Sequence, residues 1–423
     1  MGHEQSFAKA GNLNLWLYKK DNGILGFRWH IGEDIHSDSC LAFMDTYSSK
    51  PCPTTRERGP IARSSRQRWS VSLEGVWHED PGFTIQCHGI EEGGVDACNQ
   101  ENTPVPCVEL TGGVRMPRVM LGTAYIGEKH GAGAQNPEVV ESAPAIEAAI
   151  DLDVPYQGLD LGSQMHPAYA NEAAVGALLA ARPGRRKELF LTTKLSPNEH
   201  GFQSTLKAFQ RSLRLLGTDT IDLYLIHHPS CLMTDNCEGD WVQSWKAMER
   251  LYDMGAARAI GVSNFDANIL THLLGDGDTQ PGLAQAPVAL LQNRADPLAL
   301  EDSRVLSICQ AHGINYQAFS VLGRQWVVGP WSQYWKAPHP ILSHPQVQAI
   351  AQRISKEHND SIGPAQVVLK WALQKGWSVV PKTANVDRLE SNRRLFHFNL
   401  TEADMMILDH LDAPPVSEQG AEL

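Results

Sequence analysis

Residues 218–229, TDTIDLYLIHHP, are the stretch that decides the fold of this chain. Four aliphatic residues and Tyr224 lie close together in it, which is typical of a strand buried on both faces. The strand should end at His227-His228-Pro229, because proline has no amide hydrogen to donate to a neighbouring strand. The sequence therefore predicts a buried strand with an imidazole at its carboxyl end.

Other apolar segments end in the same way and are followed by helical patterns. The residues at their ends are Asp160, Lys194, Ser263, Asn264, Gln292, Phe319, Ser320 and Lys382. The clearest helical pattern spans residues 202–217 and stops at Gly217. This alternation over roughly 300 residues predicts a parallel sheet, and about eight units favour a (β/α)8 TIM barrel. In such barrels the chemistry lies at the carboxyl ends of the strands.

The composition is that of an ordinary globular protein. Of the 423 residues, 42% are hydrophobic and 20% charged, and the net charge of −12 argues against a nucleic-acid-binding protein. No apolar segment reaches the roughly 18 residues of a membrane span. The first residues lack the apolar core of a secretory signal, although Gly2 fits a short myristoylation pattern. We therefore expect a cytoplasmic protein.

The eight cysteines show no CxxC spacing, which argues against a zinc ribbon or a thioredoxin motif. Without a secretory signal, reduced thiols are expected. A metal site formed by His227 and His228 is not expected either, because adjacent residues of a strand point to opposite faces.

The chain divides near residue 108. Residues 1–107 lack the strand–helix alternation and contain hairpin-like segments at 13–32 and 68–87, so we interpret them as a β-rich extension of unknown role. Residues 108–423 are interpreted as the barrel, and residues 108–124 should form a hairpin that leads into its first strand.

The barrel resembles the aldo-keto reductase family over residues 108–413. The matching segments occur in order: MPRVMLGTA (116–124), GLDLG (158–162), YANEAAVG (169–176), LFLTTKLSP (189–197), TIDLYLIHHP (220–229), ARAIGVSNF (257–265), LLQN (290–293), AFSVLG (318–323) and VVPKTANVDRLESN (379–392). The resemblance implies a (β/α)8 enzyme that reduces an aldehyde or ketone with NADPH. This family binds NADPH without a Rossmann fold, which agrees with the lack of a GxGxxG fingerprint.

The resemblance implies four catalytic residues. Tyr169 would be the general acid, Lys194 and Asp160 the pair that lowers its pKa, and His227 the group that orients the carbonyl. The chemistry agrees with these residue types. A phenol with a pKa of roughly 10 donates poorly at neutral pH, and a neighbouring ammonium lowers that pKa and stabilises an oxyanion.

Further residues are implied to bind the cofactor and substrate. Those for the cofactor are Gly122, Thr123, Ser263, Asn264, Gln292, Phe319, Ser320, Leu322, Lys382, Thr383, Arg388 and Asn392. Lys382, Thr383 and Arg388 resemble the family's cluster on the 2′-phosphate, which favours NADPH over NADH. Substrate contacts are expected from Tyr125, His227 and His228. Neither the identity of the carbonyl compound nor the oligomeric state can be read from the sequence.

Two alternatives remain open at this point. Each catalytic candidate has an ordinary structural interpretation, such as a helix N-cap for Asp160 or a core histidine for His227. The residues between Asp160 and Tyr169 are more numerous than in the family, so this loop must bulge for Tyr169 to reach Lys194. The chain could thus be a NADPH-binding module without turnover, resembling potassium-channel beta subunits, with residues 1–107 recruiting a partner.

Overall fold

The computed structural model describes residues 6–10, 13–19, 25–31, 98, 105–127, 140–151, 156–182, 184–232, 237–275, 281–323 and 339–412. The chain divides into two compact units, Met1–Gly94 and Val95–Leu423. Gly2 and the hairpin predicted at 68–87 lie outside the described residues. Among the described helices, none combines the length and the apolar character that a bilayer crossing requires.

The first unit contains a small antiparallel sheet. Its strands are β1 (Ser6–Ala10), β2 (Leu13–Lys19) and β3 (Leu25–Ile31). They pair in the order β1-β2-β3, and Lys19 lies opposite Leu25 where β2 and β3 adjoin.

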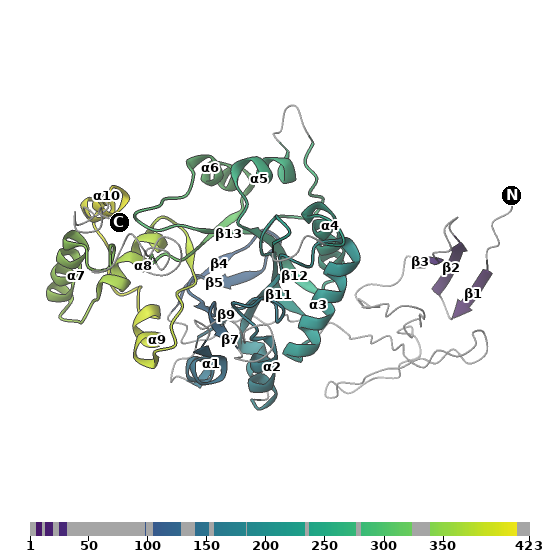
Figure 1. The fold of residues 1–423 in the computed structure, drawn as a ribbon, viewed down its shortest axis with the longest axis horizontal. Helices are drawn as coiled ribbons and strands as arrows, with labels where there is room; N and C mark the ends of the chain where they lie inside the picture. The colour runs from purple at the N-terminus through teal and green to yellow at the C-terminus, as the bar shows by residue number, and fades with distance from the viewer. Residues whose placement is uncertain are drawn as a thin grey trace, which may run out of the picture. The chain divides into compact units, whose positions relative to one another are not determined.

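The second unit is built on a curled parallel sheet of eight strands (Figure 1). The strands are β6 (Leu121–Gly122), β9 (Gly158–Asp160), β10 (Phe190–Leu195), β11 (Ile221–Ile226), β12 (Ala257–Ser263), β13 (Leu290–Arg294), β14 (Asn315–Phe319) and β15 (Ser378–Val379). They neighbour one another in chain order, and parallel bridges Val119–Val379 and Gly122–Lys382 join the first to the last. This arrangement is consistent with the predicted (β/α)8 fold.

Helices follow the strands and cover the sheet. They are α1 (Ser142–Asp151), α2 (Glu172–Ala180), the 3-10 helix η3 (Arg185–Glu188), α3 (Phe202–Leu216), α4 (Trp241–Asp253), α5 (Ala267–Leu274), α6 (Ser303–His312), α7 (Pro345–His358), α8 (Pro364–Gln374), α9 (Val386–Arg393) and α10 (Glu402–Asp409). Helices α2, α3 and α4 contact one another in succession along one side (Figure 1). Consecutive strands of a parallel sheet need such crossover helices between them.

Sequence patterns explain individual elements. All six residues of β11 are buried, as its apolar composition predicts, and Tyr224 packs edge-on against Phe209 of α3. Helix α3 ends at Gly217, which adopts the left-handed conformation with φ 62° that glycine tolerates best.

The predicted hairpin before the first barrel strand is present. Strands β4 (Cys107–Glu109) and β5 (Arg115–Pro117) pair antiparallel. The buried side chains of Leu110, Val114 and Met116 belong to one apolar cluster with residues of the barrel strands, among them Phe190 and Leu223. The hairpin therefore contributes to the barrel core. A second short pair, parallel, joins β7 (Ile126–Gly127) to β8 (Val140–Glu141).

The expectation of reduced thiols is wrong for two cysteine pairs. The structure joins Cys98 to Cys107, just before the hairpin, and Cys231 to Cys237, in the segment after β11. The paired cysteines are nine and six residues apart in the sequence, spacings that the search for CxxC motifs does not cover. Cys309 is a buried free thiol.

Candidate active site

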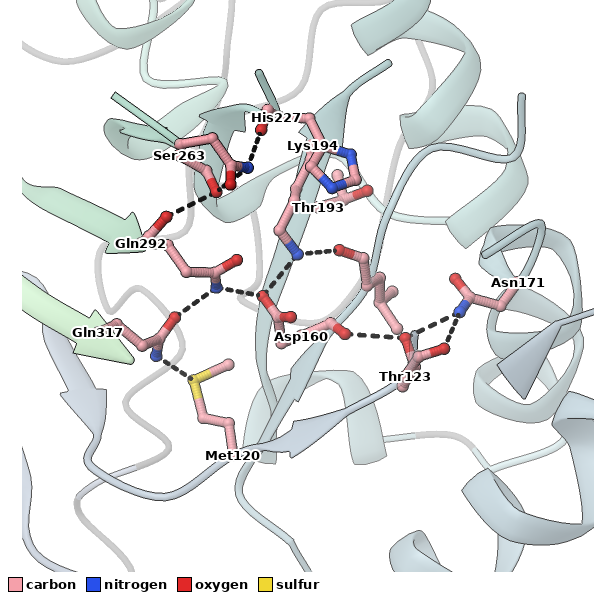
Figure 2. Close-up of polar contacts among 12 residues, drawn as sticks. Met120, Thr123, Asp160, Asn171, Thr193, Lys194, His227, Ser263, Gln292 and Gln317 are labelled. Carbon is pink, nitrogen blue, oxygen red and sulfur yellow. Dashed lines mark hydrogen bonds and ion pairs between the residues drawn. The ribbon is translucent and has the colours of Figure 1, made fainter. Parts of the chain in front are cut away.

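A buried ion pair between Lys194 and Asp160 lies at the centre of the candidate site (Figure 2). Lys194 Nζ is 2.8 Å from Asp160 Oδ1 and donates a second hydrogen bond, of 2.7 Å, to the Leu161 carbonyl. Asp160 ends β9, and Lys194 lies near the end of the adjacent β10. Their side chains are 4% and 0% exposed, so water screens this pair very little.

Two glutamines extend this pair across the sheet (Figure 2). Gln292 Nε2, on β13, donates to Asp160 Oδ1 at 2.9 Å and to Gln317 Oε1, on β14, at 2.7 Å. The amide nitrogen of Gln317 lies 3.8 and 4.0 Å from the sulfur atoms of Met116 and Met120. The Asp160 carboxylate is thus held by hydrogen bonds from two different strands, which fixes its position.

Ser263 and Asn264 lie beside this network at the end of β12. Ser263 Oγ donates to the Gln292 carbonyl at 2.7 Å, and Asn264 Nδ2 donates to the His227 carbonyl at 2.8 Å. These bonds connect the ends of β11, β12 and β13. Several of the strand ends that the sequence combines, among them those at Asp160, Lys194 and Gln292, are therefore neighbours in the structure.

The long loop after Asp160 brings Tyr169 to the ion pair through successive turns. The His166 amide donates to the Ser163 carbonyl, and the Tyr169 amide donates to the His166 carbonyl, each at 2.9 Å. Lys194 Nζ consequently lies 5.1 Å from the centre of the buried Tyr169 ring. The loop bulges, as the sequence requires, and Tyr169 still reaches Lys194.

The buried Glu172 anchors this loop. Its carboxylate accepts hydrogen bonds from the Gln164 amide at 2.9 Å and from the Thr193 hydroxyl at 2.8 Å. Gln164 in turn accepts a bond from the Ala173 amide at 3.1 Å. Since Thr193 directly precedes Lys194 on β10, Glu172 ties the loop to the strand that carries the ammonium group.

Three aromatic rings meet beside the ion pair. The ring of His227 lies 4.6 Å from that of His166, tilted by 33°, and 5.4 Å from that of Tyr169, edge to face. His166 and Tyr169 also contact edge to face, with ring centres 5.4 Å apart. Within the described residues, His227 Nδ1 is buried without a hydrogen-bond partner.

Burial governs the protonation of these groups. The pKa of His227 falls well below its usual value through burial, with His166 and Lys194 contributing, and burial lowers the pKa of His166 to about 4. Both imidazoles are therefore neutral at pH 7. Burial also lowers the pKa of Lys194, while Asp160 opposes that shift.

The pKa of Tyr169 does not follow the expectation from the sequence. Burial raises it well above the ordinary value, and the negative charge of Asp160 adds to the rise, so the expected lowering is wrong for this structure. The physical reason is geometric. Lys194 faces the ring of Tyr169 while its hydrogen bonds go to Asp160 and the Leu161 carbonyl.

The first barrel strand contributes Gly122 and Thr123. A Cβ on Gly122 would lie 2.4 Å from the Val380 carbonyl oxygen, so only glycine fits there. The Thr123 hydroxyl donates to the Asp160 carbonyl at 2.8 Å and accepts from Asn171 Nδ2 at 2.8 Å. Both polar functions of Thr123 are thus engaged within the protein.

The remaining predicted substrate and ring contacts lie at strand ends. His228 Nδ1 accepts from the Ser230 amide at 3.0 Å, and burial lowers the pKa of its imidazole. Phe319 is partly buried and packs against the barrel core. Leu322 and Tyr125 are both half-buried, and Tyr125 lies three residues after the end of β6. Four non-glycine residues around the site have left-handed backbones: Tyr125 (φ 59°), Ala170 (φ 48°), Asn264 (φ 60°) and Ser320 (φ 55°).

The residues predicted to bind the 2′-phosphate lie just before α9 and in its first turn. Lys382 bridges to Gly122 of the first strand, and the buried Thr383 accepts a 3.0 Å bond from the Asn385 amide. Arg388 is exposed in the first turn of α9, and Asn392 is buried in the same helix. A helix N-terminus with nearby cations favours anions.

Sequence reasoning missed two residues of the site. His166 lies among the additional residues of the loop before Tyr169 and contacts the ring of His227. A histidine in this part of the loop could have been recognised from the sequence as a candidate site residue. Gln317 is a polar residue inside the otherwise apolar part of β14, a buried position that requires a hydrogen-bond partner.

Comparison with known proteins agrees with this geometry. The family model of the aldo/keto reductase family matches residues 118–413. An aldo-keto reductase of Mycolicibacterium vanbaalenii is 35% identical over 72% of this chain and 95% of its own length. A 9,11-endoperoxide prostaglandin H2 reductase of Trypanosoma cruzi is 34% identical over 72% of this chain and 91% of its own.

A solved structure extends the likeness to three dimensions. The aldo-keto reductase of Bombyx mori in complex with NADP superposes with a TM-score of 0.57 at 29% identity, covering 72% of this chain and 92% of that one. Together with the match to the family model over residues 118–413, these relatives show that the chain is an oxidoreductase of the aldo-keto reductase family.

Proposed function

We propose that this chain reduces the carbonyl group of an aldehyde or ketone to an alcohol, with NADPH as the hydride donor. The observation that carries the proposal is the buried Lys194–Asp160 pair, which lies beside Tyr169 and His227 at the ends of parallel strands. A buried charge pair, a phenol and a neutral imidazole in one place are suited to stabilising a developing alkoxide.

Tyr169 would donate the proton to the carbonyl oxygen. Its raised pKa keeps the phenol in the proton-donating form throughout the neutral range, but burial also makes the phenol a weaker acid. The reverse reaction needs a deprotonated phenol, so the same shift disfavours alcohol oxidation near pH 7. The Lys194 ammonium would stabilise the negative charge that the phenol develops as it gives up its proton.

His227 would orient the carbonyl. Its neutral imidazole can donate one hydrogen bond to the carbonyl oxygen. Tyr125 and His228 would line the substrate site with it. The substrate class we propose is a small carbonyl compound.

The chain offers matching groups for the cofactor, which supplies the hydride when bound. Ser263, Asn264 and Gln292 would hold the carboxamide of the nicotinamide ring. In the part of the chain that the structure describes, Gln292 Oε1 accepts no hydrogen bond, which leaves an acceptor for an amide. Phe319 would stack on the ring, with Gly122, Thr123, Ser320 and Leu322 around it.

The cluster at the start of α9 would bind the adenosine end. Lys382, Thr383 and Arg388 would contact the 2′-phosphate, and Asn392 the adenine. A 2′-phosphate carries about two negative charges and hydrogen-bond acceptors that suit both cations. This is why we propose NADPH rather than NADH.

We further infer that residues 108–423 form a closed catalytic barrel and that residues 1–107 are a β-rich extension of unknown role. The bridges between the first and last strands support the closure.

The test compares the full chain with its Tyr169→Phe variant by following NADPH absorbance with a panel of aldehydes and ketones. We expect turnover to fall roughly 10²- to 10⁴-fold in the variant, which is the contribution typical of general acid catalysis. NADPH affinity, from fluorescence titration, should be unchanged. Tyr252→Phe on α4 serves as a matched control.

Three outcomes would decide the matter. Equal turnover in Tyr169→Phe and the native chain would refute the assignment of Tyr169 as the general acid. If NADH bound as tightly as NADPH, or if Arg388→Gln did not weaken NADPH binding, the proposed 2′-phosphate site would be refuted. Tight NADPH binding with no turnover on any carbonyl would favour the non-turnover module instead.

A further inference from the structure

The loop between Asp160 and Tyr169 carries an imidazole that the mechanism above does not use. His166 contacts the rings of both Tyr169 and His227, with centres 5.4 and 4.6 Å away. Its own ring is fixed, because Nδ1 accepts a 3.1 Å hydrogen bond from the Ala168 amide. In the neutral ring the proton therefore lies on Nε2.

His227 lacks the usual means of fixing an imidazole. A histidine in a reactive site is normally oriented by a hydrogen bond on its second ring nitrogen. Within the described residues, His227 Nδ1 is buried without a partner. The ring is instead flanked by His166, tilted by 33° to it with ring centres 4.6 Å apart, and by Tyr169, edge to face.

The loop that carries His166 is built to hold this ring in place. Its turns run from Ser163 through His166 to Tyr169, and the buried carboxylate of Glu172 anchors the Gln164 amide. The additional residues of the loop therefore form an anchored support beside the candidate catalytic rings.

We propose that His166 is a positioning residue, which holds the His227 ring in its orientation by ring packing in place of a hydrogen bond. This inference rests on the proposed carbonyl reduction, because its consequence is the placement of the carbonyl that His227 orients. A misplaced carbonyl slows hydride transfer, and a displacement of about 1 Å can cost about a hundredfold in rate.

Two complementary variants of the full chain separate ring packing from loop structure. His166→Phe keeps a planar ring and removes the acceptor for the Ala168 amide. His166→Asn keeps a side-chain acceptor for an amide two residues on and removes the ring. His312→Ala, an exposed histidine at the end of α6, is the control.

We expect His166→Asn to lower kcat about 10- to 100-fold with an unchanged Kd for NADPH, and His166→Phe to stay within about threefold of the native chain. The deuterium isotope effect on kcat, with NADPH deuterated at the transferred hydrogen, should rise in His166→Asn alone. Full activity in His166→Asn with loss in His166→Phe would overturn the proposal, since the turn would then be what matters. Equal loss in both variants would overturn it as well.

A second readout does not depend on turnover. In ¹⁵N-histidine-labelled protein, the ring signals of His227, assigned with His227→Asn, should report one neutral tautomer in the native chain and in His166→Phe. They should broaden or shift in His166→Asn. If no carbonyl compound is turned over, the proposed function fails while this spectrum still tests the positioning. Unchanged His227 signals in His166→Asn would refute it.

Discussion

Replacing Lys194 with methionine should destabilise the barrel strongly. The substitution removes the cation from an ion pair whose side chains are 0% and 4% exposed. The Asp160 carboxylate would stay buried with Gln292 Nε2 as its donor. Removing one partner of a buried pair costs about 3–5 kcal/mol, because the other charge stays uncompensated.

The loss of stability in Lys194→Met can be measured as a fall in melting temperature. In a domain of this size about 1 kcal/mol corresponds to roughly 2 °C, so Lys194→Met should melt about 6–10 °C lower. In the double variant Lys194→Met/Asp160→Asn no charge is left behind, and a neutral replacement of a buried pair is often tolerated. It should recover most of that loss.

The control is Lys375→Met, which breaks an ion pair of similar length, 2.7 Å to Asp409, with side chains 22% and 30% exposed. Partly exposed pairs contribute about 1 kcal/mol or less, so its melting temperature should shift by no more than about 2 °C. Circular dichroism melts of the four proteins decide the question. A Lys194→Met variant as stable as Lys375→Met, or a double variant no better than the single one, would refute the reasoning.

Three further predictions concern other parts of the barrel. His166 takes up a proton near pH 6.5 in the unfolded chain but only near pH 4 in the folded chain, so the free energy of unfolding should fall as the pH drops from 6.5 to 4. A plot of melting temperature against pH should therefore be flatter for His166→Phe than for the native chain, and an identical slope would contradict this prediction. Gly176→Ala should cost several kcal/mol in urea unfolding, because the new Cβ would lie 1.8 Å from the Leu215 carbonyl oxygen. Gly363→Ala, whose Cβ would meet only Gln366 Oε1 at an ordinary 4.0 Å, should cost less than about 1 kcal/mol. In a Cys98→Ser/Cys107→Ser background, reducing the Cys231–Cys237 bond with dithiothreitol should lower the melting temperature by a few degrees, since this bond closes a short loop. Adding Cys231→Ser/Cys237→Ser to that background should remove the response to dithiothreitol.

The sequence predicts the sheet well because its signals are local. Strands β11 and β12 are short, largely apolar runs, and the strand ends predicted at Asp160, His227 and Ser263 lie within a residue of where the structure has them. Strand β15 stops three residues before Lys382, where the chain continues through a single bridge.

Interactions between distant residues were not predictable. The orientation of Lys194 toward the face of the Tyr169 ring depends on where the loop turns place that ring, so the direction of the Tyr169 pKa shift was missed. The bond from Gln292 to Gln317 joins two strands whose relative register no local pattern encodes. The cysteine pairs likewise have spacings that match no recognised motif in the sequence.

The left-handed backbones at Tyr125, Ala170, Asn264 and Ser320 have a consequence for evolution in the laboratory. Outside glycine, such a conformation costs of order 1–2 kcal/mol per residue, and asparagine tolerates it better than alanine or serine. Selection of random variants for heat resistance alone should therefore enrich glycine or asparagine at Ala170 and Ser320. Ala170 follows Tyr169 directly and Ser320 follows Phe319. Glycine at these positions would stabilise the fold but would also make the backbone next to both aromatic rings more flexible. A thermostable lineage should accordingly be screened for turnover at every round.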